Sequence, residues 1–343
     1  MEINKIFEAA VKESASDIHL VVGRPPILRI HGQLFSLPAT PAFTREVLRD
    51  LIYSILTDGQ KQRFEKELGM DFSYEIEDGT RFRVNIFSEK SNFSLAARLI
   101  PSQVPTMAEL DMPQICYDLT REKQGLILVT GPTGCGKSST LAAMIDLINA
   151  ERTEHIITLE DPMEFIYKAK KSIIVQRQLG SDMISFAHAL KHGLRQDPDV
   201  ILVGEMRDFE TISLAITTAE TGHLVLSTLH TQSAAQTVDR ILDVFPPHQQ
   251  NQVRMQLSMT LKGVISQRLL PKIGGGRTAV REILVNTPAV ANIIRENKIP
   301  QISTVMQTSI EKGMVTFEHE LKRLVDAGAI EREVAVEYFK DLL

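Results

Sequence analysis

The stretch of sequence that decides the fold reads Gly131-Pro132-Thr133-Gly134-Cys135-Gly136-Lys137-Ser138. It matches the pattern G-x-x-x-x-G-K-[ST] at every position. An apolar run that ends at Thr130 precedes it, and a helical pattern over residues 139–149 follows it. A strand, a glycine-rich loop and a helix in this order predict a phosphate-binding loop. A glycine-rich turn without a ligand is the alternative, and the flanking strand and helix argue against it.

The chemistry of such a loop assigns roles to its residues. Glycines allow the backbone N–H groups to face inward, and the amino end of the following helix adds positive potential. We expect Lys137 to reach the β- and γ-phosphates and Ser138 to bind Mg²⁺ through its hydroxyl. We expect Cys135 to have a structural role. The predicted nucleotide-binding residues of the loop are Gly131, Pro132, Thr133, Gly134, Cys135, Gly136, Lys137, Ser138 and Ser139.

Acidic residues follow two further apolar runs. Glu160, Asp161 and Glu164 come after residues 156–159, and Glu205 comes after residues 200–203. Hydrolysis of a phosphoanhydride needs a held metal ion and an oriented water, so acids at strand ends are candidates for both tasks. Gly204 stands where phosphate-loop enzymes usually have an aspartate. Metal contact at Glu205 is therefore expected to be indirect or shared with the first cluster.

Histidines and arginines flank these segments. His223 and His230 bracket residues 224–229, without the spacing of a zinc site. Two interpretations fit these histidines: hydrogen-bonded structural residues, or sensors of the γ-phosphate. Surface or ion-pair roles are the simplest interpretation for most arginines. The arginines near candidate segments are Arg195, Arg207 and Arg240, with Arg81, Arg83 and Arg98 earlier in the chain.

The 343 residues are consistent with two domains. Residues 1–100 combine helical patterns (2–13, 45–56 and 59–68) with strand patterns (18–22, 27–30, 71–76 and 81–87), which predicts a small α+β domain. Three prolines mark residues 101–113 as a linker without regular structure. In residues 114–343, continuous apolar runs alternate with helical stretches, which predicts a sheet covered on both faces and a helical tail from residue 288.

Composition excludes several classes of protein. With 38 Lys and Arg against 43 Asp and Glu, the net charge of −5 gives no general attraction to nucleic acid. Two cysteines exclude a disulfide framework and a four-cysteine zinc module, and they fit a reducing cytosol. We find neither a signal peptide nor an apolar run long enough to span a membrane, so any membrane role is expected to be peripheral.

Several motifs in order resemble the type IV pilus retraction ATPases, the PilT family of the secretion ATPase superfamily. The resemblance covers almost the whole chain. Its motifs besides the phosphate loop are Ser16-Asp-Ile-His-Leu20, Glu160-Asp-Pro-Met-Glu-Phe165 (the Asp box), Ile201-Leu-Val-Gly-Glu-Met-Arg-Asp208 (an atypical Walker B), and Glu220-Thr-Gly-His-Leu224 with Thr228-Leu-His-Thr231 (the His box). One departure is Ala291, which stands where the late motif of the family, tied to retraction, has an arginine.

This resemblance implies an α/β chain with a PAS-like α+β N-terminal domain, a RecA-like P-loop ATPase domain and C-terminal helices. It implies a homohexamer that binds ATP and Mg²⁺ between subunits. Glu164 would orient the attacking water, Glu205 would help to hold Mg²⁺, and His230 with His223 would read the γ-phosphate. The arginines expected at a nucleotide site, some across a subunit boundary, are Arg81, Arg83 and Arg98.

The function implied is pilus retraction by ATP hydrolysis, through an inner-membrane platform protein, at the cytoplasmic face of that membrane. The nearest alternative is a pilus assembly or type II secretion ATPase, which two cysteines disfavour because those chains usually carry a four-cysteine zinc motif. An accessory retraction ATPase without useful turnover is a further alternative. A hexameric nucleic-acid motor is less compatible with the acidic balance and the absence of tryptophan.

Overall fold

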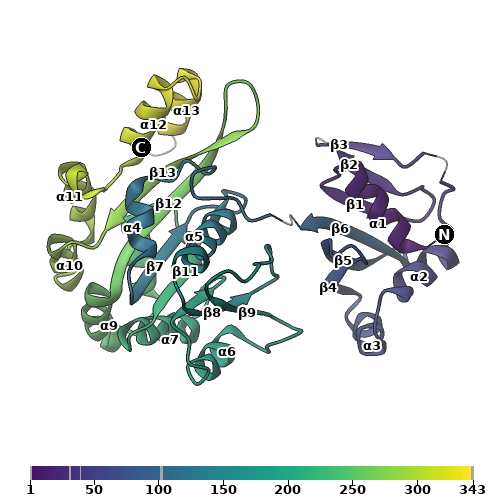
Figure 1. Ribbon diagram of the computed structural model, residues 1–343, viewed down its shortest axis with the longest axis horizontal. Helices are drawn as coiled ribbons and strands as arrows, with labels where there is room; N and C mark the ends of the chain where they lie inside the picture. Colours follow the sequence, from purple (N-terminus) through teal and green to yellow (C-terminus); the bar gives the residue numbers. More distant parts are fainter. Residues whose placement is uncertain (1, 31, 39, 101–102, 341–343) are drawn as a thin grey trace. The chain divides into compact units, whose positions relative to one another are not determined.

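The computed structural model describes residues 2–30, 32–38, 40–100 and 103–340 (Figure 1). The chain divides into two compact units. The N-terminal unit contains Met1–Gln103 and Pro162–Ile166, and the C-terminal unit contains Val104–Asp161 and Tyr167–Leu343. Each unit has its own sheet and its own hydrophobic core.

The N-terminal unit contains one six-stranded antiparallel sheet. Its strands are β1 (Asp17–Leu20), β2 (Ile27–Ile30), β3 (Gln33–Ser36), β4 (Gly69–Glu75), β5 (Arg81–Glu89) and β6 (Asn92–Ile100). Its helices are α1 (Ile3–Lys12), α2 (Arg45–Ser54) and α3 (Asp58–Glu67). The strand order is β3-β2-β1-β6-β5-β4.

Residue periodicity explains how this unit packs. Along β5, Phe82, Val84 and Ile86 are fully buried, and the residues between them are less buried. Side chains alternate between the two faces of a strand, so one face of the sheet is apolar. The amphipathic helix α1 contributes Phe7, whose ring meets that of Phe82 edge to face at 4.5 Å between centroids.

Caps define the ends of the two following helices. Thr44 accepts a hydrogen bond from the Val47 N–H and starts α2. Thr57 and Gln60 form a capping box at the start of α3.

Two strands of this unit, β3 and β6, were not predicted. All residues of β3 are exposed, so it has no apolar period, and β6 combines small, polar and apolar residues.

The C-terminal unit is built on a seven-stranded mixed sheet. Its strands are β7 (Gly125–Thr130), β8 (His155–Glu160), β9 (Ile173–Gln178), β10 (Val200–Val203), β11 (Leu224–Leu229), β12 (Leu261–Pro271) and β13 (Arg277–Val285). The order is β13-β12-β7-β11-β10-β8-β9. All neighbouring pairs are parallel except β12 and β13, which form an antiparallel hairpin at one edge.

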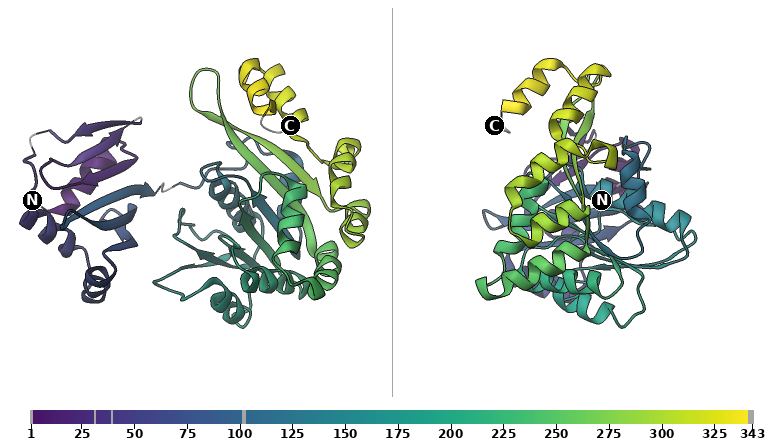
Figure 2. Two further views of the ribbon diagram at one scale, coloured as in Figure 1. Left: turned by 180° about the vertical axis from the view of Figure 1, so that it is seen from behind. Right: turned by 90° about the vertical axis from the view of Figure 1, so that its left-hand side faces the viewer.

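Helices cover both faces of this sheet (Figures 1 and 2). They are α4 (Gln114–Thr120), α5 (Lys137–Glu151), α6 (Phe186–Gly193), α7 (Phe209–Glu220), α8 (Ala234–Asp243) and α9 (Pro247–Thr260). The tail contains α10 (Pro288–Arg295), α11 (Ile302–Thr308), α12 (Phe317–Asp326) and α13 (Arg332–Lys340), with short 3₁₀ turns at Ile299–Gln301 and Ile310–Lys312. A mixed α/β fold with a largely parallel sheet is therefore confirmed.

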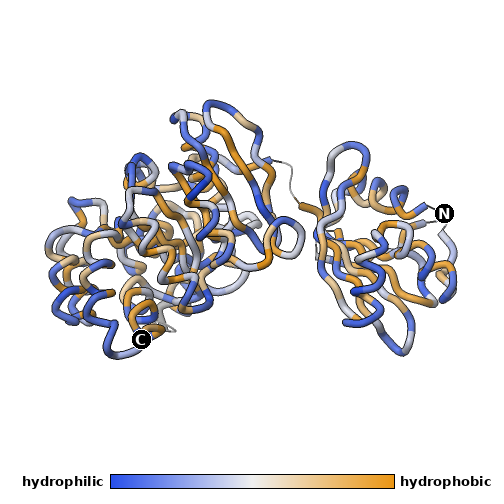
Figure 3. The backbone as a smooth tube through the Cα atoms, turned by 90° about the horizontal axis from the view of Figure 1, so that it is seen from below, coloured by the Kyte–Doolittle hydropathy of each residue, from blue (hydrophilic) through white to orange (hydrophobic). Residues whose placement is uncertain are grey.

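Burial on both faces explains the composition of the central strands. Every residue of β7, β10 and β11 is buried. Figure 3 shows hydrophobic segments of the chain running through the interior of the unit. This agrees with the apolar runs predicted before the phosphate loop and at residues 200–203. The strands β9, β12 and β13 were not predicted, because polar residues such as Gln267 and Glu282 interrupt their apolar pattern.

The predicted linker, residues 101–113, has two parts in the structure. Residues 101 and 102 lie outside the described residues. Residues 104–113 form turns that group with the C-terminal unit. Arg281 donates to the carbonyl oxygens of Leu110 (2.7 Å) and Asp111 (3.1 Å), and Arg323 pairs with the Asp111 carboxylate at 2.7 Å. Side chains of the C-terminal unit therefore hold this segment.

Candidate nucleotide-binding site

The phosphate loop connects β7 to the amino end of α5. Gly131, Gly134 and Gly136 have φ angles of +138°, +78° and +89°, which L-residues with a side chain rarely adopt. A Cβ atom on Gly131 would lie 2.2 Å from the Gln267 carbonyl oxygen, so this position also needs glycine for space. A Cβ atom at Gly134 would meet nothing within 4 Å, so the loop leaves room there.

Lys137 and Ser138 occupy the first turn of α5. The Lys137 ammonium donates to the carbonyl oxygens of Gly131 (2.8 Å) and Pro132 (3.0 Å), which places its charge over the loop. Ser138 and Ser139 follow at the amino end of the 15-residue helix, where the backbone dipoles favour anions. Burial raises the pKa of the Cys135 thiol, so this side chain packs as an uncharged group.

The carboxyl end of β10 lies at the same end of the sheet as the phosphate loop, and β10 is two strands away from β7. Its last residue, Val203, pairs with Ser227 of β11, and Leu229 at the end of β11 pairs with Thr130. A Cβ atom on Gly204 would lie 3.1 Å from the Leu159 carbonyl oxygen. An aspartate would therefore be crowded at this position, and the carboxylate follows one residue later, at Glu205.

Glu205 has two basic neighbours. Its carboxylate lies 2.6 Å from an Arg207 Nη and 3.5 Å from the His230 Nε2. Only 13% of the Glu205 side chain is exposed, against 72% of Arg207 and 50% of His230. Arg207 and His230 therefore hold the Glu205 carboxylate in place, and both partners remain open to solvent. The structure thus brings Glu205 and His230 together.

The acids after β8 have different surroundings. Glu160 is the last residue of β8, is 8% exposed, and accepts hydrogen bonds from Thr158 Oγ1 (2.6 Å) and Gln176 Nε2 (3.3 Å). Asp161 and Glu164 are exposed. Glu164 falls in Pro162–Ile166, which groups with the N-terminal unit. The three carboxylates therefore do not form one solvated cluster, because Glu160 is sealed by its own partners.

His223 and His230, both expected to read the γ-phosphate, lie apart within a single chain. They lie at opposite ends of β11, and strands rise about 3.3 Å per residue, so about 20 Å separates them. The His223 Nδ1 lies 3.1 Å from the Thr218 carbonyl oxygen, and its backbone carbonyl accepts from Gly125 at the start of β7. His223 is therefore part of the amino end of the sheet.

The three arginines singled out in the N-terminal unit share one face of its sheet. Arg81 and Arg83 are two residues apart on β5, and Arg98 of β6 is the cross-strand partner of Arg83. Each pairs with a carboxylate. Arg81 lies 2.6 Å from Glu75, Arg83 lies 3.6 Å from Asp71, and Arg98 lies 2.8 Å from Asp17. Burial opposes ionisation of Asp17, but hydrogen bonds from Ser16 and Arg98 outweigh it and lower its pKa.

The residues present fit a nucleotide with its divalent ion. The open space at Gly134 and the left-handed glycines form a cradle of backbone donors. The Ser138 hydroxyl and the Glu205 carboxylate are oxygen ligands of the kind that Mg²⁺ prefers. In the part of the chain that the structure describes, no group of three or more His, Cys, Asp or Glu side chains could hold a metal ion by itself.

Among the same residues, no helix has the length and apolarity required to cross a membrane.

Two residues that contact the phosphate loop or Glu160 were not predicted from the sequence. Gln267 of β12 binds the phosphate loop, and Gln176 of β9 binds Glu160. Both are polar residues in strands whose pattern was not recognised. The available signal was a polar triplet, Ser266-Gln267-Arg268, within an otherwise apolar run.

Comparisons with known proteins agree with the motifs. The family model for type II/IV secretion system proteins matches residues 1–275. The type IV pilus retractation ATPase PilT of Pseudomonas aeruginosa is 48% identical over 340 residues, which cover 99% of this chain and 98% of that protein. A twitching motility protein of Neisseria gonorrhoeae is 49% identical over 311 residues, or 90% and 83% of the two chains.

A solved structure is similar along nearly the whole chain. The crystal structure of the pilus retraction motor PilT with bound ADP aligns with a TM-score of 0.93 and 47% identity, over 98% of this chain and 96% of that one. The predicted resemblance and the prediction of an ATP hydrolase are thereby confirmed. The chain belongs to the type II/IV secretion system protein family and, within it, to the type IV pilus retraction ATPases.

Proposed function

We propose that this chain is a Mg²⁺-dependent motor that hydrolyses ATP to retract a type IV pilus. One observation carries the proposal: the phosphate loop, Glu205 and His230 each follow a strand at the carboxyl end of the parallel sheet, and Glu205 contacts His230. The carboxyl ends of parallel strands are where ligands bind in such folds.

The loop residues have separate tasks in this proposal. Lys137 and the backbone N–H groups of the loop bind the phosphate oxygens, and the amino end of α5 adds its dipole. Ser138 and Glu205 would hold Mg²⁺, Glu205 directly or through water. When bound, the ion neutralises charge that develops on the transferring phosphoryl group. Arg207 orients Glu205 through their 2.6 Å contact.

Glu164 is proposed as the residue that orients the attacking water, as the family resemblance implies. It is exposed, and only three residues separate it from Glu160 at the end of β8. His230 is proposed to report the γ-phosphate, because its ring contacts Glu205 and half of its side chain is exposed.

The oligomer and the finer fold assignment also belong to the proposal. We infer a homohexamer with a PAS-like N-terminal domain (1–100), a linker (101–113) and a RecA-like ATPase domain (114–343), as the resemblance implies. Arg81, Arg83 and Arg98 would act on nucleotide, some of them in a neighbouring subunit. Their placement side by side on one sheet face supports this, because clustered guanidinium groups suit a polyphosphate.

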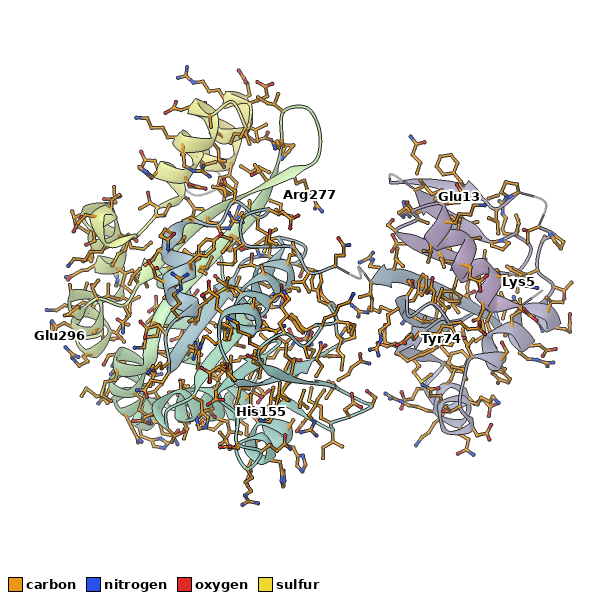
Figure 4. The ribbon with its side chains drawn as sticks, viewed as in Figure 1. Lys5, Glu13, Tyr74, His155, Arg277 and Glu296 are labelled. Carbon is orange, nitrogen blue, oxygen red and sulfur yellow. The ribbon has the colours of Figure 1, made fainter. Side chains whose placement is uncertain are left out.

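Retraction further requires a partner. We propose an inner-membrane platform protein, with the motor working peripherally at the cytoplasmic face. The departure at Ala291 does not remove the polar face of the late motif. Ala291 is 9% exposed and faces inward, while Asn292 and Arg295 on α10 and Glu296 directly after it are exposed (Figure 4 labels Glu296).

The test combines steady-state phosphate release by the purified chain with pilus retraction in a retraction-deficient strain that expresses it. We expect turnover by an oligomer and restored twitching. Binding of ATP without turnover would favour the accessory role. Turnover by a strictly monomeric preparation would overturn the shared site, and salt-dependent DNA binding with DNA-stimulated turnover would favour a nucleic-acid motor.

A further inference from the structure

Gln267 is an uncommon residue for its position. It lies in β12, which runs beside β7 (Figure 1), and it directly follows Ser266, the partner of Thr130 at the end of β7. Its exposed fraction is 1%. A buried amide needs hydrogen bonds to offset the loss of water, so both ends of this side chain require partners.

Both ends of the amide have partners in the phosphate-loop segment. The Gln267 Nε2 donates to the carbonyl oxygen of Cys135 at 2.8 Å, and its Oε1 accepts from the Thr140 hydroxyl at 2.9 Å. Thr140 lies one turn into α5 and is itself buried. Because Thr140 supplies a donor and Cys135 only an acceptor, the amide has one orientation that satisfies both contacts.

The hydrogen bond to Cys135 also determines the direction of a loop N–H. A trans peptide is planar, so the carbonyl of Cys135 and the N–H of Gly136 point in opposite directions. Gln267 draws that carbonyl toward β12 and thereby turns the Gly136 N–H away from β12. Gly136 could otherwise rotate easily, because it is a glycine at φ +89°. The contact is close: a Cβ atom on Gly136 would lie 3.3 Å from Gln267 Nε2.

We propose that Gln267 is a positioning residue of the phosphate loop, which holds the Cys135–Gly136 peptide with its N–H toward the bound phosphates. Gln267 acts through the loop and does not contact the nucleotide. This inference rests on the proposed nucleotide site. It predicts that Gln267 governs phosphate affinity more than it governs folding, because the peptide it holds is part of the cradle.

The test uses the full-length chain and measures the Kd of a fluorescent ADP analogue with Mg²⁺, together with the melting temperature without nucleotide. Gln267→Met keeps the size of the side chain and removes both hydrogen bonds. Gln267→Glu keeps an acceptor for Thr140 and places an anionic oxygen against the Cys135 carbonyl. We expect Kd to rise about tenfold in the first variant and at least as much in the second.

A matched control separates positioning from stability. Asn286 donates to the carbonyl oxygens of Ser258 (2.9 Å) and Leu261 (2.8 Å) at the other end of β12, far from the loop. Asn286→Leu should lower the melting temperature while Kd stays within about twofold. Thr140→Val, which frees one end of the Gln267 amide, should raise Kd about threefold and remains informative if a Gln267 variant does not fold.

The outcomes are distinct. If Gln267→Met, Gln267→Glu and Thr140→Val all bind ADP within twofold of the wild type, as Asn286→Leu does, Gln267 is a core residue only and the inference is overturned. Lys137→Ala in the same assay tests the site itself. Unchanged binding by that variant would overturn the nucleotide site, whereas lost binding there with unchanged Gln267 variants would overturn only the role of Gln267.

Discussion

The two ends of the parallel sheet in the C-terminal unit use polar side chains differently. At the amino end, polar side chains bond to backbone: the His155 Nδ1 lies 3.1 Å from the Asp197 carbonyl oxygen, and His223 and Asn286 also contact carbonyl groups (Figure 4 labels His155). At the carboxyl end, Glu205 contacts the side chains of Arg207 and His230, and both partners are largely exposed.

This difference separates structural groups from reactive ones. At the amino end, His155, His223 and Asn286 satisfy backbone carbonyl groups. Charged side chains that bond to one another, and that remain partly open to solvent, can exchange partners with a ligand. The comparison therefore predicts that substitutions at the carboxyl end change turnover, whereas those at the amino end change stability.

The largest effect is expected at Lys137. Lys137→Ala removes the ammonium that lies over the loop carbonyls, and with it the charge opposite the phosphates. ATP turnover should fall at least about 100-fold, because one preorganised charge contributes about 3 kcal/mol or more in such sites. Phosphate release measures this. Lys170→Ala, which removes an exposed ion pair with Asp146, is the control and should stay within twofold of the wild type.

Glu164→Ala should come next. Loss of the residue that orients water lowers kcat by about 10²-fold or more, and nucleotide affinity should change little because the phosphate loop is intact. Phosphate release and ADP binding, measured on one preparation, separate the two quantities. Near-normal release would remove Glu164 from the mechanism. Glu318→Ala, which removes an exposed carboxylate in α12, is the control.

His230 and His223 provide the sharpest test of the comparison. His230→Ala should lower kcat about tenfold, because it removes a partner of Glu205, whereas His223→Ala should change kcat less than twofold. The His223 variant should instead lower the melting temperature, since it loses a contact to the Thr218 carbonyl. Equal kcat losses in the two variants would break the distinction between the ends of the sheet.

The smallest effect is a pH-dependent gain in stability at Glu282. This carboxylate of β13 accepts from the Ala234 N–H at the start of α8, and burial raises its pKa despite that hydrogen bond. A raised folded-state pKa means that its contribution to stability is complete at acidic pH and is lost as pH rises through the folded pKa. Glu282→Gln should therefore raise the melting temperature by about 2–4 °C at pH 8.

The gain at Glu282 should shrink at pH 5, which thermal denaturation at both pH values would reveal. Glu318→Gln, an exposed change in α12, should have the same small effect at both. An equal gain for Glu282→Gln at pH 5 and pH 8 would mean that its charge does not destabilise the fold.

The sequence predicted the central strands and the phosphate loop because continuous apolar runs and a fixed glycine spacing are local signals. It missed β9, β12 and β13 because polar residues in these strands find their hydrogen bonds only in the folded protein. Gln267 illustrates this: it lies about 130 residues beyond Cys135, and nothing in its neighbourhood along the chain indicates that contact.

The candidate site divides in the same way. Lys137, Ser138 and Glu205 could be predicted because each lies directly beyond an apolar strand or a glycine motif. The separation of His223 from His230 follows from the strand that they flank, but their surroundings could not be predicted. The direction of β11 in the sheet decides which of the two lies at the carboxyl end, beside Glu205.

The sequence by itself determined that a strand, a glycine loop and a helix follow one another and bind phosphate, because these depend on neighbours in the chain. Tertiary structure alone decided which groups are in contact. Gln267 binds the phosphate loop, Arg207 and His230 contact Glu205, and Gln176 donates a hydrogen bond to Glu160. The physical reason is that hydrogen bonds and ion pairs act over about 3 Å in space, and the order of strands in the sheet sets which residues come that close.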